Sequence, residues 1–125
     1  MRAVRTFEPH ADQVVEARRF VTSALAGWGV ADPDVALLVS ELATNAVLHA
    51  RSDFTVRVDL EDSGRLRVEV QDRNSRLPTF AAVGPEAYSG RGLTLLQHLS
   101  AAWGVDAHGA DGKTIWFELS PAEAH

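Results

Sequence analysis

The sequence contains no cysteine, which excludes disulfides, thiolate catalysis and the usual structural zinc sites. Long apolar runs are also absent, and the longest uninterrupted ones are far too short to span a membrane. The first five residues lack the apolar core of a signal peptide, which predicts that the mature protein begins at Met1 and stays in the cytoplasm. The net charge of −5 argues against a dedicated nucleic-acid binder. We therefore expect neither a membrane nor a nucleic acid as a direct partner.

The 125 residues have room for one domain with one hydrophobic core. Hydrophobic residues make up 46% of the chain, which is ordinary for a globular protein. No repeat, low-complexity tract or linker divides the sequence. We therefore predict a single domain over residues 1–125.

Apolar residues recur at helical spacing in three stretches. The first predicted helix covers residues 12–28. The second covers residues 33–49, because Asp32 is a typical N-cap and Pro33 suits the first helical position. The third is predicted over residues 92–103.

Strict alternation of apolar and polar residues over 54–60 and 66–70 predicts an antiparallel hairpin. Further strands are predicted over residues 4–7, 105–107 and 113–119. Residues 73–90 have no periodicity, and a loop of this length in a compact domain is more often functional than idle. The order β-α-α-β-β-loop-α-β-β predicts an α+β fold, a two-layer α/β sandwich with helices on one face of a mixed, mostly antiparallel sheet.

The second predicted helix carries Glu41, Asn45 and His49, which stand four residues apart and share one stripe of the helix. A carboxylate and an amide beside a buried arc are costly unless another group satisfies them. In the functional interpretation, Asn45 offers its side-chain oxygen to Mg²⁺, which binds few protein ligands together with phosphates and waters. Glu41 is then a general base or a water-orienting group. In the alternative interpretation, these residues are only the polar edge of an amphipathic helix.

Two further signals come from strand ends. Asp72 stands where a strand gives way to a loop, and its carboxylate could accept a hydrogen bond from a ligand's amino group. Thr114 begins the last strand, where its hydroxyl could join Asp72 around a base edge. Both residues also have plain structural explanations, because aspartate is a common turn former and threonine favours strands.

The segment that runs into the third predicted helix contains Gly90, Arg91, Gly92 and Leu93. Two glycines let backbone N–H groups approach a phosphate, and the start of a helix adds a favourable dipole. Arg91 could add a charge-assisted contact. The same segment also suits an ordinary loop end with a capping glycine.

Together, and in this order, these segments resemble the motifs of the GHKL (histidine-kinase-like) ATPases, most of all the anti-sigma-factor serine/threonine kinases of bacterial partner-switching systems. Residues 39–50 look like the N box, and Asp72 matches the aspartate of the G1 box. Residues 90–93 resemble the G2 box, and residues 112–114 resemble the late threonine segment. The resemblance covers nearly the whole chain and implies the Bergerat ATP-binding fold, with ATP and Mg²⁺ as cofactors.

The resemblance also implies roles for single residues. Asn45 would bind Mg²⁺, and Glu41 would deprotonate or orient the attacking hydroxyl. Asp72 and Thr114 would read adenine. The residues implied in phosphate binding are Gly90, Arg91 and Gly92, followed by Leu93. His49 matches the end of the N-box pattern, and we expect it to pack locally.

The sequence departs from the family pattern after Asp72. The G1 box has glycines two and four residues after its aspartate, whereas this chain has Asn74 and Arg76. Asn74 tolerates left-handed backbone angles and is a candidate substitute within the cofactor-binding set, but Arg76 is not. The chain also has no helical-hairpin domain with a phosphorylated histidine, so we do not expect a complete autophosphorylating sensor kinase.

The resemblance implies ATP-dependent phosphorylation of a serine or threonine on a small antagonist protein, with a sigma factor as a second partner. Three alternatives stay open. The first is a degenerate relative that sequesters partners without phosphotransfer, and the second is a metalloenzyme that uses Glu41 and His49. The third is a detached catalytic domain of a sensor kinase, which the N-terminal strand and helix fit less well than the anti-sigma group. Family members commonly pair with themselves, so a homodimer is a further expectation, and exposed apolar residues on the first helix would suit it.

Overall fold

The computed structural model describes the backbone of residues 1–74 and 88–121, and their side chains except at residue 49 and residues 88–93. Its elements are β1 (Arg2–Phe7), α1 (Ala11–Gly27), α2 (Pro33–Asn45), the π-helical turn η1 (Ala46–Ala50), β2 (Phe54–Leu60), β3 (Leu66–Asp72), α3 (Tyr88–Leu99), β4 (Ala102–Ala107), the 3₁₀ turn η2 (Gly109–Asp111) and β5 (Lys113–Leu119). Apart from the two short turns, this is the predicted order. Most of the predicted loop over residues 73–90 lies outside the described residues.

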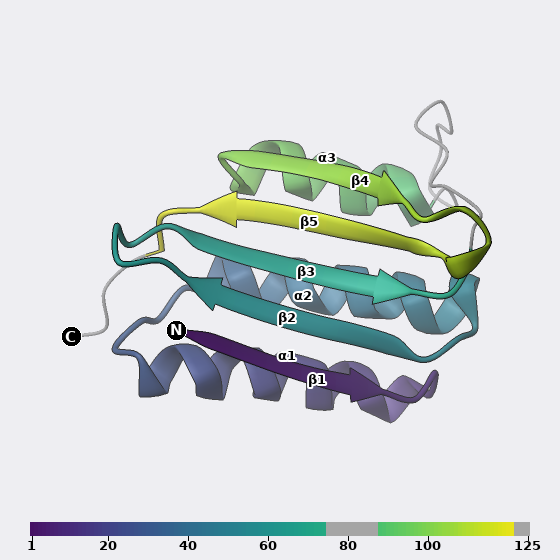
Figure 1. Ribbon diagram of the computed structural model, residues 1–125, viewed down its shortest axis with the longest axis horizontal. Coiled ribbons are helices and arrows are strands. Elements are labelled where there is room, and N and C mark those ends of the chain that lie inside the picture. Colours follow the sequence, from purple (N-terminus) through teal and green to yellow (C-terminus); the bar gives the residue numbers. More distant parts are fainter. Residues whose placement is uncertain (75–87, 122–125) are drawn as a thin grey trace.

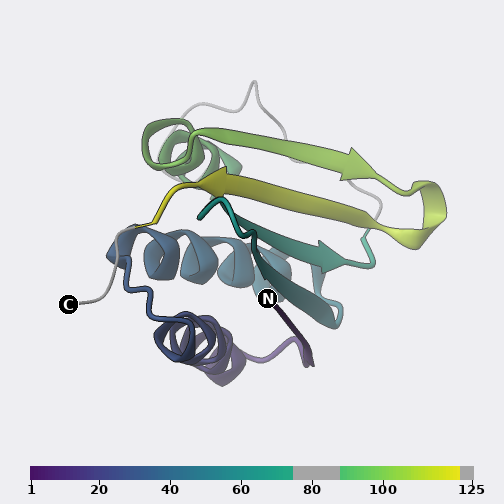
Figure 2. The ribbon, with the colours of Figure 1, turned by 60° about the vertical axis from the view of Figure 1, so that its left-hand side comes forward.

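The five strands form one sheet in the order β1-β2-β3-β5-β4. The three helices cover one face of this sheet, and the other face is open (Figure 1, Figure 2). These observations confirm the predicted α+β two-layer fold. Each strand pairing in the described sheet is antiparallel, so the sheet is more regular than the mixed one that we predicted.

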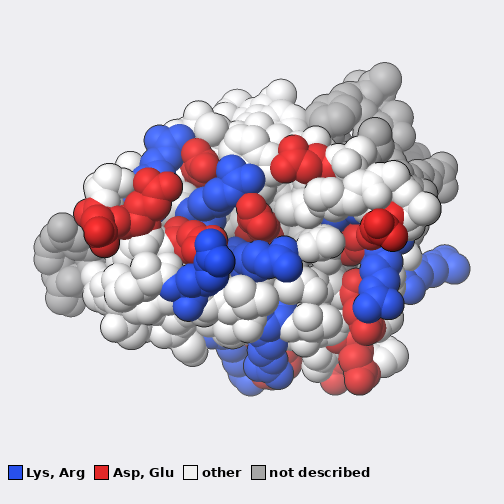
Figure 3. Space-filling view, in the orientation of Figure 1, with Lys and Arg blue, Asp and Glu red and all other residues white. Residues whose placement is uncertain are grey.

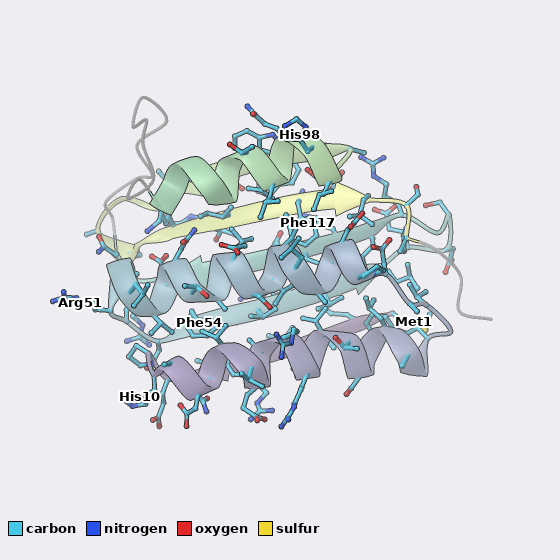
Figure 4. The ribbon with its side chains drawn as sticks, turned by 180° about the vertical axis from the view of Figure 1, so that it is seen from behind. Met1, His10, Arg51, Phe54, His98 and Phe117 are labelled. Carbon is cyan, nitrogen blue, oxygen red and sulfur yellow. The ribbon has the colours of Figure 1, made fainter. Side chains whose placement is uncertain are left out.

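The alternating strands determine which residues form the core. Every second residue of β2 and β3 is buried, beginning with Phe54 and Leu66 respectively, and the residues between them are half-exposed. Phe54 and Phe117 are fully buried and lie between the helices and the sheet (Figure 4). The ring of Phe54 stacks on Phe7 at a centroid distance of 5.3 Å, which ties β1 to the core.

The N-terminus of α2 is built as the sequence predicts. Asp32 is the N-cap, and its Oδ1 accepts a hydrogen bond from the backbone N–H of Asp34 at 2.9 Å. Pro33 occupies the first helical position, where its missing N–H has no consequence. This capping places the start of the helix, and therefore the positions of Glu41 and Asn45 along it.

The bounds of the third helix differ from the prediction of residues 92–103, because α3 begins at Tyr88 and ends at Leu99. At its C-terminal end, the backbone N–H of Ser100 donates to Leu96, and that of Ala101 already donates to Glu118 of β5. Trp103 therefore lies in β4, opposite Phe117 of β5. Pairing with β5 overrides a helical pattern that contained no breaking residue before Gly104.

The large apolar side chains that are exposed among the described residues are Met1, Val4, Leu37 and Leu48. None of them lies on α1. On that helix Val21 and Leu25 are buried, whereas Val14, Val15 and Phe20 are half-buried, so the expected homodimer surface stays a prediction. Within the described part of the chain, no helix has both the length and the apolar character that crossing a membrane requires.

Candidate functional site

The most unusual buried group in the structure is an ion pair where β3 ends and β5 begins. Asp72 and Lys113 are opposite each other in the antiparallel register, and their exposed fractions are 5% and 4%. The ammonium nitrogen of Lys113 lies 3.0 Å from each carboxylate oxygen of Asp72. It also donates to the backbone carbonyl of Asn74 at 3.2 Å. The backbone N–H of Asn74 in turn donates to Oδ1 of Asp72 at 2.9 Å, so the carboxylate is held from two sides.

The approach of β5 to Asp72 depends on Gly112. Its φ of +109° lies in a region that residues other than glycine rarely adopt. A Cβ built at this position would lie 2.0 Å from the carbonyl oxygen of Asp72. The same Cβ would lie 2.7 Å from Cα of Arg73. A glycine is therefore required at this position for Lys113 to reach Asp72.

Thr114 does not meet Asp72, contrary to our prediction that the two side chains converge. Successive residues of a strand point to opposite faces of the sheet. Lys113 and Ile115 share the helix-covered face with Asp72, so Thr114 points to the open face. There its hydroxyl lies 2.7 Å from Nε2 of His108. A group that contacts the Asp72 carboxylate from the helix side would meet Lys113, not Thr114.

Glu41 and Asn45 lie one turn apart on α2, and both are half-buried. Asn45 is the last α-helical residue before η1, and its side chain caps no backbone group of that turn. The turn closes with a hydrogen bond from the backbone N–H of Arg51 to the carbonyl of Ala46, and Arg51 has a left-handed φ of +52°. Such π-helical turns are frequent at functional sites. The neighbour Thr44, by contrast, donates its hydroxyl to the carbonyl of Ser40 at 2.7 Å.

The predicted phosphate-binding segment lies wholly within the first turns of α3, whereas we predicted that Gly90 and Arg91 would precede the helix. Gly90, Arg91, Gly92 and Leu93 all follow the first helical residue, Tyr88. Glycine costs a helix only about 1 kcal/mol relative to alanine, so two glycines do not prevent helix formation. The positions of these four side chains lie outside the described residues, as does the structure around Arg76.

These elements meet at one end of the molecule. Figure 1 shows that β3 ends, β5 begins, α2 ends and α3 begins at the same end. The view from behind shows the helical layer in front of the sheet, with Arg51 at that end (Figure 4). The structure thus places Glu41 and Asn45, Asp72 and Lys113, and the start of α3 in one region on the helix-covered side.

The open face of the sheet carries a separate charged network. Arg67 donates to Glu69 and to Glu118 at 2.9 and 3.0 Å, and Arg65 donates to Glu118 at 3.1 Å. The Arg67 guanidinium also lies 4.2 Å from the ring centre of Trp116. The hydrogen bond from Arg67, aided by Arg65, holds the pKa of the Glu118 carboxyl below its ordinary value although partial burial opposes this. Figure 3 shows positive and negative side chains interleaved on this face, so it presents no patch of one sign.

Sequence reasoning missed two residues of the site, Lys113 and Gly112. The sequence did contain a signal for Lys113. It stands two residues before Ile115 in a strand whose alternate residues are apolar, so the alternation places its side chain on the core face. The metal site left open for Glu41 and His49 is not tested, because the side chain of residue 49 lies outside the described residues. Among the described side chains, no three acidic, histidine or cysteine groups gather as ligands.

Comparison with known families gives one match over most of the chain. The model of the family described as "Histidine kinase-like ATPase domain" matches residues 7–119. No curated protein matches the sequence.

Several solved structures have the same fold. The RsbU and RsbW domains of Rv1364c from Mycobacterium tuberculosis match with a TM-score of 0.75 and 21% identity, over 100% of this chain and 34% of that chain. The histidine kinase domain of the blue-light activated kinase EL346 from Erythrobacter litoralis has a TM-score of 0.54 and 27% identity, over 70% of this chain and 43% of that one. Full-length ShkA in complex with AMPPNP has a TM-score of 0.59 and 20% identity, over 98% of this chain and 32% of that chain. The chain therefore covers less than half of each solved protein.

Proposed function

Because the chain belongs to the histidine kinase-like ATPase domain family, we propose that it binds Mg·ATP and phosphorylates a serine or threonine of a small antagonist protein, as an anti-sigma-factor kinase does. The observation that carries the proposal is the buried Asp72 carboxylate, which lies at the same end and on the same side of the sheet as Asn45 and the start of α3. The proposal includes a cytoplasmic location, a sequestered sigma factor and a homodimer.

The residues present fit a nucleotide. Asp72 Oδ1 accepts from Asn74 and Lys113. Among the described residues, Oδ2 has only the Lys113 ammonium nearby, at 3.0 Å, so it keeps one acceptor position for an amino group. Asn45 has a side-chain oxygen of the kind that Mg²⁺ accepts, and one such ligand is enough when phosphates and waters complete the shell. The first turn of a helix leaves backbone N–H groups without an intrahelical partner, so the start of α3 at Tyr88 suits a phosphate.

Bound Mg·ATP would supply the phosphoryl group and the charge neutralisation that its transfer needs. Glu41 lies one helical turn before Asn45 on α2. In the proposed reaction its carboxylate would accept the proton of the attacking hydroxyl. Asp72 and the hydrogen-bonded groups around it would hold the base and so fix the position of the nucleotide.

Two similarities support the kinase assignment over a bare ATPase. The structure that includes an RsbW domain aligns with this chain over its whole length, and the N-box-like helix resembles that of anti-sigma-factor kinases. A nucleotide site of this fold is supported by ShkA, which was solved in complex with AMPPNP.

Titration calorimetry of Mg·ATP into the purified protein tests nucleotide binding. We expect micromolar affinity, and a loss of tenfold or more in the variant Asp72→Asn, because its side-chain amide presents an N–H₂ group where the carboxylate accepts. Asp59→Asn is the matched control, since Asp59 is a carboxylate of the same sheet that pairs with Arg2 at the opposite end of β2. No binding to the unmodified protein at millimolar ATP would refute the proposal.

Transfer of labelled phosphate to candidate antagonist proteins tests the kinase activity. Asn45→Ala should abolish transfer and also remove the effect of Mg²⁺ on nucleotide affinity, because both depend on the metal ligand. Full transfer by this variant would show that Asn45 is not that ligand.

A second candidate function is a regulator that binds nucleotide but transfers no phosphate. It is favoured by Arg76, which stands at a position where the family has glycine. Mg·ATP binding without phosphorylation of any antagonist, together with capture of a sigma factor, would support this candidate over the kinase.

A further inference from the structure

We propose that Lys113 determines which purine the nucleotide site accepts, by donating a hydrogen bond to N1 of adenine beside the Asp72 carboxylate. The inference rests on the proposed nucleotide-binding function and assigns a role to a residue that had none. It starts from the finding that Lys113, and not Thr114, shares the buried corner with Asp72.

The hydrogen-bond capacity of Lys113 is not exhausted by its contacts. A protonated lysine has three N–H donors and no acceptor. One N–H shared between the two oxygens of Asp72, both at 3.0 Å, and one directed at the carbonyl of Asn74, at 3.2 Å, leave a third. Since Oδ2 of Asp72 also has one acceptor position left, the corner presents one donor next to one acceptor.

This pair is complementary to adenine. The edge of adenine carries an amino donor beside the N1 acceptor, so Asp72 would accept from the amino group while Lys113 donates to N1. Guanine in the same orientation reverses the pattern, with an oxygen facing Asp72 and an N–H facing Lys113. A buried site that is built for one pattern rejects the other strongly, because its own polar groups lose their partners.

The ion pair is not required for packing. Exchanging a buried ion pair for apolar residues of similar volume is often neutral or stabilising, and Asp72 and Lys113 are both about as buried as the core around them. What the ion pair adds is a fixed position for the ammonium group, held by Asp72, Asn74 and the close approach at Gly112. A donor that is already fixed binds a ligand with less loss of conformational entropy.

Calorimetry on the unmodified protein tests the inference without any substitution. The probes are Mg·ATP, its 1-deaza analogue, in which a carbon replaces N1, and Mg·GTP. We expect the 1-deaza analogue to bind tenfold or more weaker than ATP, and GTP to bind weaker still. Equal affinity for ATP and the analogue would overturn the role of Lys113 while leaving the proposed function intact. Failure to bind any of the three would overturn both.

The variant Lys113→Met then identifies the donor. It should bind ATP more weakly and discriminate less than about threefold between ATP and the 1-deaza analogue, because the group that senses N1 is gone. Arg73→Met is the matched control: it removes a positive charge next to Asp72 in sequence, but its side chain is exposed. Tighter ATP binding by Lys113→Met would overturn the inference, since Lys113 would then be competing with the nucleotide for Asp72.

Discussion

Replacing Gly112 with alanine should destabilise the protein far more than the same change at Gly64. Both glycines have positive φ, +109° and +91°, so alanine at either position adds backbone strain of about 1–3 kcal/mol. The space around them differs. No atom lies within 4 Å of a Cβ built at Gly64, whereas one at Gly112 would lie 2.0 Å from the carbonyl oxygen of Asp72.

The clash at Gly112 cannot be relieved by moving a side chain, because the atoms it meets belong to the backbone of Asp72 and Arg73. The start of β5 must move away from β3, and the Lys113 ammonium moves with it. Separating the partners of a buried ion pair costs about 3–5 kcal/mol, because a charge is left buried without its partner. We therefore expect Gly112→Ala to be less stable than Gly64→Ala by about 3 kcal/mol or more.

Urea denaturation of the two variants measures this difference. With an m value of about 1–3 kcal/mol/M, the midpoints should differ by about 1 M or more. Unfolding free energies within about 1 kcal/mol of each other would refute the reasoning, because they would show that the strands separate at this corner without cost. Gly112→Ala should also lose ATP affinity if it folds, whereas Gly64→Ala should keep it.

Two further predictions concern stability away from the site. Removing the N-cap of α2 with Asp32→Ala should cost about 1 kcal/mol in urea denaturation, because the N–H of Asp34 loses its acceptor, and an unchanged midpoint would contradict this. The pKa of Glu118 is lowered from an ordinary value of 4.5, so its contribution is complete above that pH and is lost as the pH falls through the lower, folded-state pKa. Stability measured from pH 6 downward should therefore fall by about 0.5–1 kcal/mol less in Glu118→Gln than in the unmodified protein, and parallel curves would show that the network on the open face contributes nothing.

The strands were largely predictable because their signal is local. The alternation over residues 54–60 and 66–70 indicates directly which residues of each strand face the core. The structure has the predicted pairing of these two strands. The N-terminus of α2 was predictable for the same reason, since Asp32 and Pro33 act within one turn of the helix. The site residues Glu41, Asn45 and Asp72 came from motif order, and the structure places them at one end of the fold.

What could not be predicted depends on contacts between distant segments. Ala102 and Trp103 continue the helical pattern of α3, but pairing with Glu118 and Phe117 of β5 converts them to a strand. The π-helical turn after Asn45 ends at Arg51, which has a left-handed backbone conformation although it is not a glycine. The sequence therefore contains no residue type that would have predicted this turn. For β4, the stabilising contacts come from residues that are not neighbours in sequence.

The wrong prediction for Thr114 arose because a sequence motif does not say which face of a strand each of its residues occupies. A motif records which residue types occur together, whereas the pleat determines which of them share a face, and a shift by one residue exchanges the faces. Here Ile115 is on the core face, so the residue two places before it, Lys113, must be on that face as well. The pleat therefore brings a cation beside Asp72, where the motif had suggested a neutral hydroxyl. In the function proposed above, nucleotide recognition at this corner would act through a charged pair, and adenine would use the donor and the acceptor that this pair leaves available.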